Sequence, residues 1–155
     1  PIQPVYDKDS RVLILGSFPS VKSREQGFFY GHPQNRFWKV MANVLEWEVP
    51  TTIEEKRKML LENHVAVWDV IASCSIVGSS DTSIKDVVVN DFSRILENSK
   101  VERVYVNGGK AYELYHKYAE KVTGIKAVKL PSTSPANAAW SLEKLTKTWK
   151  EIIEI

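Results

Sequence analysis

The stretch RVLILGSFPSVKSREQGFFYGHPQNRFWKV, residues 11–40, decides the fold of this chain and directs attention to its function. Residues 11–15 form a short apolar run, which is typical of a β-strand that is buried on both faces of a sheet. Gly16 ends the run, and the loop that follows mixes Gly, Pro and Ser with aromatic side chains. Aromatic residues in a loop directly after a buried strand favour a binding surface over a simple connection.

Strand and helix patterns alternate along the rest of the chain. We expect further strands at 64–71, 101–107 and 125–131. Helices are expected at 35–45, at 53–63 behind Thr51 or Thr52, behind Asn90 or Asp91, after Gly108 and Gly109, and over residues 142–153. Most of the segment 73–89 is expected to be loop, with IKDVVV at 84–89 either a short strand or irregular. The alternation predicts an α/β protein with three α/β/α layers around a central, mostly parallel four-stranded sheet.

The bulk properties are those of one globular domain over residues 1–155, with 43% hydrophobic and 26% charged residues. A net charge of +2 permits nucleic-acid binding without arguing for it, because 21 cations are nearly balanced by 19 anions. The single cysteine, Cys74, excludes an intrachain disulfide and a metal or iron–sulfur centre held by cysteines. No secretory signal or membrane-spanning apolar run is found, so we expect an intracellular, cytoplasmic protein without metal, cofactor or membrane contact.

In a parallel sheet, the loops at the carboxyl ends of the strands gather around one cleft. The cleft predicted here is poor in the usual catalytic groups: the histidines are His32, His64 and His116, no carboxylate pair stands out, and a GxxxxGK[ST] phosphate loop is absent. The site would have to work through backbone amides, the side-chain amides of Asn35 and Asn107, hydroxyl groups and aromatic faces. This inventory suits hydrolysis of an N-glycosidic bond, in which the departing base needs hydrogen-bond donors and a water must be held.

Four segments of the chain resemble, in the same order, motifs of the uracil-DNA glycosylase superfamily. They are GFFYGHPQNRFWKVM at 27–41, WDVIASCSIVGSSDTSI at 68–84, VNGGKA at 106–111 and LPSTSPANA at 130–138. GSFPS at 16–20 together with PQNRFW at 33–38 is most similar to the hypoxanthine-DNA glycosylase branch, which is related to the mismatch-specific uracil and thymine glycosylases. The resemblance implies a DNA repair enzyme that hydrolyses the N-glycosidic bond of a deaminated base flipped out of damaged DNA, leaving an abasic site. Hypoxanthine is the favoured base, and uracil or xanthine would fit the same chemistry.

Two usual catalytic positions of the superfamily are replaced in this chain. Phe18 stands where the mismatch-specific enzymes have an asparagine that positions the attacking water, and Ser132 begins a motif that often starts with His or Asn. The resemblance to the hypoxanthine branch implies that Asn35 is the catalytic residue instead, with its amide accepting a hydrogen bond from the water. Asn35 also precedes a helix pattern, where Asn is a favoured N-cap, and the two roles are compatible. Asp81 is the alternative catalytic residue.

The resemblance also assigns residues to the base and to DNA. Tyr30 is expected to stack under the flipped base. The expected base-binding residues are Gly16, Ser17, Phe18, Pro19, Ser20, Tyr30 and Asn107. The loop 132–137, which in the family presses against the minor groove, and the cations around the first loop are expected to contact DNA. These residues are Ser132, Thr133, Ser134, Pro135, Asn137, Lys22, Arg24 and Arg36.

Two other classes of function stay open on the sequence. One is a hydrolase of free nucleosides or nucleotides, and the other is a non-catalytic module that binds a damaged base, which the replaced catalytic positions make plausible. The cluster of Lys22, Arg24, Arg36 and Lys39 around the first loop suits a phosphate backbone better than a single nucleoside, and Lys129 would add to it from the fourth strand. Since no lysine stands out as desolvated in the cleft, we expect a monofunctional glycosylase without lyase activity. We also expect a monomer.

Overall fold

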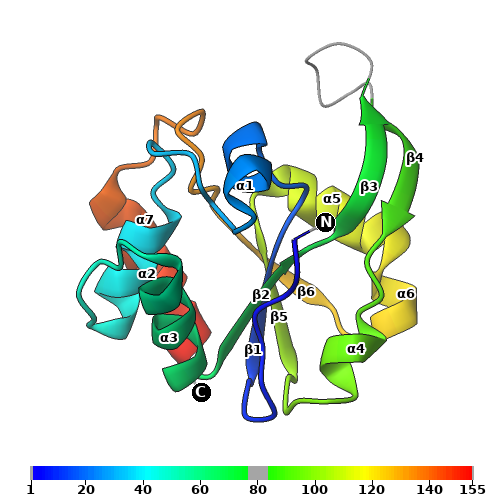
Figure 1. The fold of residues 1–155 in the computed structure, drawn as a ribbon, viewed down its shortest axis with the longest axis horizontal. Coiled ribbons are helices and arrows are strands. Elements are labelled where there is room, and N and C mark those ends of the chain that lie inside the picture. Colours follow the sequence, from blue (N-terminus) through cyan, green and yellow to red (C-terminus); the bar gives the residue numbers. More distant parts are fainter. Residues whose placement is uncertain (1, 77–83, 155) are drawn as a thin grey trace.

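The computed structural model describes residues 2–76 and 84–154 of the chain. Its centre is a sheet of four parallel strands in the order β2-β1-β5-β6 (Figure 1). The strands are β1 (Val12–Gly16), β2 (Val65–Asp69), β5 (Arg103–Asn107) and β6 (Ala127–Leu130). The parallel sheet predicted from the alternation is therefore confirmed, and each of these strands falls on a predicted one.

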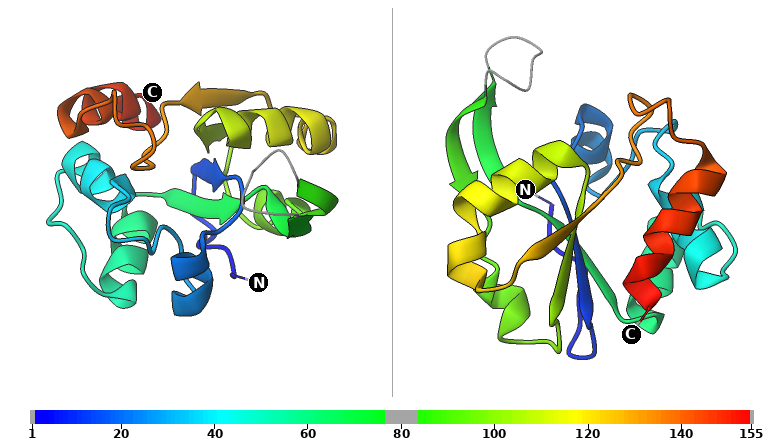
Figure 2. Two further views of the ribbon diagram at one scale, coloured as in Figure 1. Left: turned by 90° about the horizontal axis from the view of Figure 1, so that it is seen from above. Right: turned by 180° about the vertical axis from the view of Figure 1, so that it is seen from behind.

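Helices cover both faces of the sheet and complete three layers (Figures 1 and 2). One face carries α2 (Phe37–Leu45), α3 (Ile53–Glu62) and α7 (Leu142–Trp149), which continues as the 3₁₀-helix η2 (Lys150–Ile153). The other face carries α4 (Ser93–Leu96), α5 (Gly109–Tyr118) and α6 (Glu120–Thr123). The predicted α/β/α layering is confirmed.

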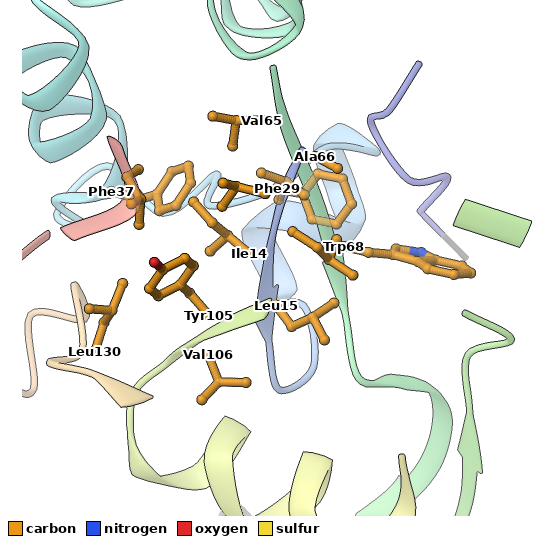
Figure 3. Close-up of a cluster of buried hydrophobic side chains, with 14 of the residues drawn as sticks. Ile14, Leu15, Phe29, Phe37, Val65, Ala66, Trp68, Tyr105, Val106 and Leu130 are labelled. Atoms are coloured by element: carbon orange, nitrogen blue, oxygen red, sulfur yellow. The ribbon is translucent and has the colours of Figure 1, made fainter. Parts of the chain in front are cut away.

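The hydrophobic core lies between the sheet and these helices (Figure 3). All five residues of β1 are buried, because this strand has neighbours on both edges and helices on both faces. From α2, Phe37 reaches the core and packs against Trp149 of α7, with ring centroids 5.8 Å apart. This contact fixes the start of α2 relative to the sheet.

The helix starts follow from local capping chemistry. The hydroxyl of Thr52 accepts the backbone N–H of Glu55 at 3.1 Å, and the Glu55 carboxylate accepts the backbone N–H of Thr51 at 2.9 Å. These two bonds begin α3, and the first selects Thr52 from the two predicted caps. Ser141 caps α7 in the same way, by accepting the N–H of Lys144 at 3.1 Å.

The prediction for residues 64–89 is wrong in two respects. The second strand ends at Asp69, and residues expected to be loop lie in a further strand, β3 (Ile71–Ile76). β3 forms an antiparallel hairpin with β4 (Ile84–Val89), which is the short strand that the sequence left open. The pairing of the hairpin is interrupted by two register shifts. Such irregularities break the period-two alternation from which strands are recognised in a sequence. Figure 1 shows the hairpin extending away from the main sheet.

The loop after β1 also differs from its prediction, because it contains the short helix α1 (Val21–Gln26). The hydroxyl of Ser20 caps this helix by accepting the backbone N–H of Ser23 at 3.1 Å. Gly27 ends it with a left-handed φ of 70°. A helix of six residues is too short to show a 3.6-residue apolar period, which is why the sequence pattern indicated loop.

The connections that follow β1 and β5 lead to opposite edges of the sheet. From β1 the chain crosses to β2 through α2 and α3 on one face, whereas from β5 it crosses to β6 through α5 on the other. Loops that leave neighbouring strands in opposite directions open a crevice at the carboxyl ends, where ligands bind in open α/β sheets. The crevice begins at Gly16 and Asn107, the last residues of these two strands. Within the described ranges, no helix combines the length and apolarity that crossing a membrane requires.

Candidate functional site

A cavity of about 900 Å³ opens where β1 and β5 end. A pocket of this size accommodates a nucleoside. Every residue predicted to bind the base lines it, as do Asn35 and the predicted DNA-contacting residues of the loop after β6. These residues are Gly16, Ser17, Phe18, Pro19, Ser20, Tyr30, Asn35, Asn107, Ser132, Thr133, Ser134, Pro135 and Asn137. The three predicted cations Lys22, Arg24 and Arg36 lie outside the cavity wall.

A buried carboxyl group in the wall of the cavity was missed by the sequence prediction. Asp69 is the last residue of β2, pairs with Gly16 across the sheet, and is only 6% exposed. Burial disfavours the charged carboxylate and raises the pKa of Asp69 to about 7. Both protonation states are therefore populated near neutral pH. An acidic residue at the carboxyl end of an apolar strand could have indicated a site residue. The sequence prediction extended this strand to residue 71, so Asp69 was placed inside it.

The hydroxyl of Tyr30 reaches the floor of the same cavity. It is buried and has no hydrogen-bond partner among the described residues. Burial raises the pKa of Tyr30, and the charge of Asp69 adds to the rise, whereas the nearby Asn107 amide opposes it. The Tyr30 ring stacks on Phe37, with ring centroids 3.9 Å apart and planes inclined by 16°. One face of the ring is thus occupied within the protein, so a flipped base can stack only on the other face.

Gly16 is the point at which these two polar groups converge. A Cβ atom on Gly16 would lie 2.5 Å from Oδ1 of Asp69 and 3.1 Å from the Tyr30 hydroxyl. The backbone of Gly16 is not in the left-handed conformation. The need for glycine at this position therefore comes from close approach of polar side chains and not from the turn itself.

Asn35 takes part in a polar chain at the start of α2. Its Oδ1 accepts the backbone N–H of Phe37 at 3.0 Å and the hydroxyl of Thr133 at 2.7 Å. The fully buried Thr133 hydroxyl in turn accepts from Nδ2 of Asn107 at 3.0 Å. Asn35 therefore bonds a backbone N–H at the helix start, although the N-cap position itself belongs to Arg36. The expectation that the amide accepts from a water is corrected, because both acceptor sites of Oδ1 are already used.

Arg36 has a different role from the predicted phosphate contact. Its guanidinium group donates to the carbonyl oxygens of Ser134 and Asn137, each at 3.0 Å, and to that of Trp140. Its backbone N–H donates to the carbonyl of Thr133 at 3.0 Å. These bonds hold the loop after β6 against the start of α2. The contact of Arg36 with DNA stays a prediction, while its terminal nitrogens are engaged within the protein.

The other two predicted cations lie on α1, beside the mouth of the cavity. Lys22 pairs with Glu25 over 3.5 Å, with both side chains more than half exposed. The guanidinium carbon of Arg24 lies 5.5 Å from the centroid of the Phe18 ring. Both cations are exposed at the surface and remain available for phosphate contacts. Ser20, predicted to bind the base, lines the cavity but uses its hydroxyl to cap α1.

Two further lysines line the cavity: Lys129, which the sequence analysis added to the phosphate-contacting cations, and Lys110, which it did not include. Lys110 is half-buried, whereas Lys129 is exposed and its ammonium group lies 5.8 Å from the ring centroid of Tyr112. Asp81, the alternative catalytic residue, lies outside the described residues. Over the described ranges, no group of three or more His, Cys, Asp or Glu side chains is arranged to hold a metal ion.

Comparison with known proteins assigns the chain to a family. The chain matches the family model of the uracil DNA glycosylase superfamily over residues 3–153. It is 33% identical to a hypoxanthine DNA glycosylase of Methanosarcina acetivorans and 31% identical to one of Methanosarcina barkeri. Each match extends over 150 residues, 96% of this chain and 93% of the relative.

A solved structure agrees with the sequence matches. It is a solution NMR structure of a protein from Methanosarcina acetivorans, which superposes with a TM-score of 0.81 at 32% identity. The alignment covers 99% of this chain and 97% of that chain. The family model, the relatives and the fold agree over nearly the whole length, and this chain belongs to the uracil DNA glycosylase superfamily.

Proposed function

We propose that this chain is a DNA glycosylase that hydrolyses the N-glycosidic bond of a deaminated base flipped out of DNA, with hypoxanthine as the preferred base. The observation that carries the proposal is the convergence of Asp69 and Tyr30 on Gly16 at the floor of a nucleoside-sized cavity. The names of the two relatives support the choice of hypoxanthine.

The polar groups of the floor suit the edge of a deaminated base. Deamination replaces an amino group by a carbonyl group and places a hydrogen on the neighbouring ring nitrogen. The Asp69 carboxylate can accept from this N–H, while the unpartnered Tyr30 hydroxyl can donate to the carbonyl. Adenine has an unprotonated ring nitrogen at the same edge, so it would leave an ionised Asp69 carboxylate without a hydrogen-bond donor. Guanine shares the N–H and carbonyl pair, so its rejection would have to come from its additional amino group.

Cleavage of the bond sends its electron pair to the departing base, while a water oxygen adds to the sugar carbon and loses a proton, so that the net reaction transfers this proton to the base. Hydrogen-bond donors that face the base stabilise the charge that develops on it. With a pKa near 7, Asp69 is partly ionised at neutral pH, and its carboxylate can accept a hydrogen bond from the N–H of the base. The open face of the Tyr30 ring supplies a stacking surface beneath the base.

Contact with DNA is proposed for the rim of the cavity and for α1. Pro135 is exposed on the loop after β6 and Ser134 is half-buried there, and Arg36 fixes the conformation of this loop. Lys22 and Arg24 would contact the phosphate backbone from α1. The enzyme acts as a monomer in this proposal, since one chain supplies the base pocket, the catalytic amide and the rim.

The proposed enzyme is monofunctional, so it leaves an intact abasic site. A lyase would use a lysine to form a Schiff base with the abasic sugar. The two lysines of the cavity wall make this a point to be tested directly. Borohydride should not trap the protein on the DNA, and strand cleavage should appear only after alkali treatment.

The test uses duplexes that each contain a single deoxyinosine, deoxyuridine or deoxyxanthosine, with the undamaged duplex and free deoxyinosine as further substrates. Chromatography of the released base and alkali cleavage of the strand give two independent readouts. The proposal expects hypoxanthine to be released fastest. Equal or faster release of uracil would overturn the base preference, and activity confined to free deoxyinosine would indicate a nucleoside hydrolase. Binding of the lesion without release of any base would indicate a binding module.

A further inference from the structure

The polar chain through Thr133 joins three parts of the fold. Thr133 lies in the loop after β6 and is fully buried. Its hydroxyl donates to Oδ1 of Asn35 at 2.7 Å and accepts from Nδ2 of Asn107 at 3.0 Å, while its backbone N–H donates to Oδ1 of Asn107 at 3.1 Å. Asn107 ends β5, and Asn35 precedes α2. The hydroxyl is therefore held by two partners from different elements.

These bonds determine which end of the Asn35 carboxamide faces the cavity. The atom opposite the backbone N–H of Phe37 must be an oxygen, because a backbone N–H only donates. Because this oxygen can only accept, the Thr133 hydroxyl must donate to it and takes its second acceptor site. Nδ2 of Asn35 has no hydrogen-bond partner among the described residues and is not buried. The NH₂ group is thus the part of the amide that remains for a ligand in the cavity.

We propose that Thr133 is a positioning residue that fixes the Asn35 carboxamide with its NH₂ group towards the substrate, so that Asn35 acts as a hydrogen-bond donor to the departing base. The inference rests on the proposed glycosylase function. A donor suits the base, because negative charge develops there as the sugar–base bond breaks. An N–H directed at the attacking water would instead bind a lone pair of its oxygen and make it less nucleophilic.

Two substitutions at Asn35 separate a donor from an acceptor. Asn35→Asp keeps an oxygen for Phe37 and Thr133 but presents a second oxygen to the cavity in place of NH₂. Asn35→Ala removes the whole amide. If Asn35 donates, both variants should slow single-turnover excision by about 10²-fold or more, as the loss of one well-placed donor does. An Asn35→Asp variant that excises at the wild-type rate would overturn the donor role.

Two substitutions at Thr133 test whether it acts through Asn35. Thr133→Val keeps the shape and loses the hydroxyl, whereas Thr133→Ser keeps the hydroxyl. We expect Thr133→Val to slow excision about 10-fold to 100-fold and Thr133→Ser to stay within about 3-fold of wild type, with unchanged affinity for a duplex carrying an uncleavable abasic analogue. In the Asn35→Ala background, Thr133→Val should cause no further loss. Losses that multiply in the double variant would show an independent structural effect and overturn the proposal.

A measurement without catalysis keeps the two proposals distinguishable. The side-chain NH₂ resonances of Asn35 are identified in a ¹H–¹⁵N spectrum by their loss in Asn35→Ala. Thr133→Val should shift them and speed their exchange with water, whereas Thr133→Ser should leave them in place. If Thr133→Val left the Asn35 NH₂ resonances and their exchange rates unchanged, the positioning role would be overturned. The wild-type protein could also give the expected spectra and yet release no base from any duplex. This result would refute the glycosylase function and leave the positioning role intact.

Discussion

A methyl group on Gly16 would lie 2.5 Å from Oδ1 of Asp69, so the last residue of β1 must be glycine for the buried carboxyl group to keep its place. We expect Gly16→Ala to displace Asp69, lower excision by at least about 10-fold and destabilise the fold by about 1–3 kcal/mol through overpacking. Gly109→Ala is the matched control, since nothing lies within 4 Å of a Cβ there. Because Gly109 lines the cavity, this variant is a control for stability alone, and at the start of α5 it should keep or raise stability by up to about 1 kcal/mol. Thermal melts and single-turnover rates on inosine duplexes measure both, and a fully active Gly16→Ala would contradict the close approach.

The raised pKa of Asp69 predicts how stability depends on pH. The unfolded chain releases this proton near the ordinary value of 3.8, whereas the folded protein retains it until about pH 7. Between these values the folded state binds more protons, so its stability should fall as pH rises and level off above pH 7. The rise in pKa corresponds to at most about 4 kcal/mol.

Asp69→Asn removes this titration while keeping the shape of the side chain. Urea unfolding from pH 4 to pH 8 should show the variant gaining stability over wild type steadily until about pH 7. Tyr30, the ionisable group facing Asp69, has a raised pKa and stays neutral throughout this range. A constant difference between the two proteins at all pH values would mean that Asp69 is ionised in the folded state.

The Tyr30 hydroxyl should contribute to recognition and not to stability. Because it is buried without a partner in the described structure, Tyr30→Phe should keep or slightly raise the melting temperature. Loss of its hydrogen bond to the base should weaken binding of the inosine duplex by about 3-fold to 10-fold.

Tyr115→Phe is the matched control for Tyr30→Phe. The Tyr115 hydroxyl lies 2.6 Å from both the Thr123 hydroxyl and the carbonyl of Ile125. Its loss should destabilise the protein by about 1–2 kcal/mol and leave DNA binding unchanged. If Tyr30→Phe were the destabilised variant and bound the lesion normally, the hydroxyl would be a structural group.

Arg36 and Arg24 should differ in how their loss changes binding to DNA. Arg24→Ala removes a proposed phosphate contact, so the slope of log affinity against log salt should decrease by about 0.9. Arg36→Lys replaces the planar donor group that binds three carbonyl groups of the loop. It should weaken binding and lower the melting temperature with the slope unchanged. A reduced slope for Arg36→Lys would restore the phosphate contact predicted from the sequence.

The sequence by itself determined the sheet and the position of the cavity. Apolar runs that alternate with amphipathic segments leave few arrangements other than parallel strands covered by helices. In such a sheet the loops after Gly16 and Asn107 must meet at one edge. Asn35 was recognised through a longer motif, which the fold brings to the same edge.

The tertiary structure alone decided which chemical groups this edge presents. In the sequence, Asp69 lies within a predicted apolar strand, and its raised pKa arises from burial within the folded protein. The sequence indicates a surface cation at Arg36, whereas in the folded protein Arg36 binds three carbonyl groups of the loop after β6. The polarity of the Asn35 amide depends on Thr133, which is 98 residues away in the chain. Burial and hydrogen bonding between distant segments set the charge and orientation of a side chain, and a local sequence pattern contains neither.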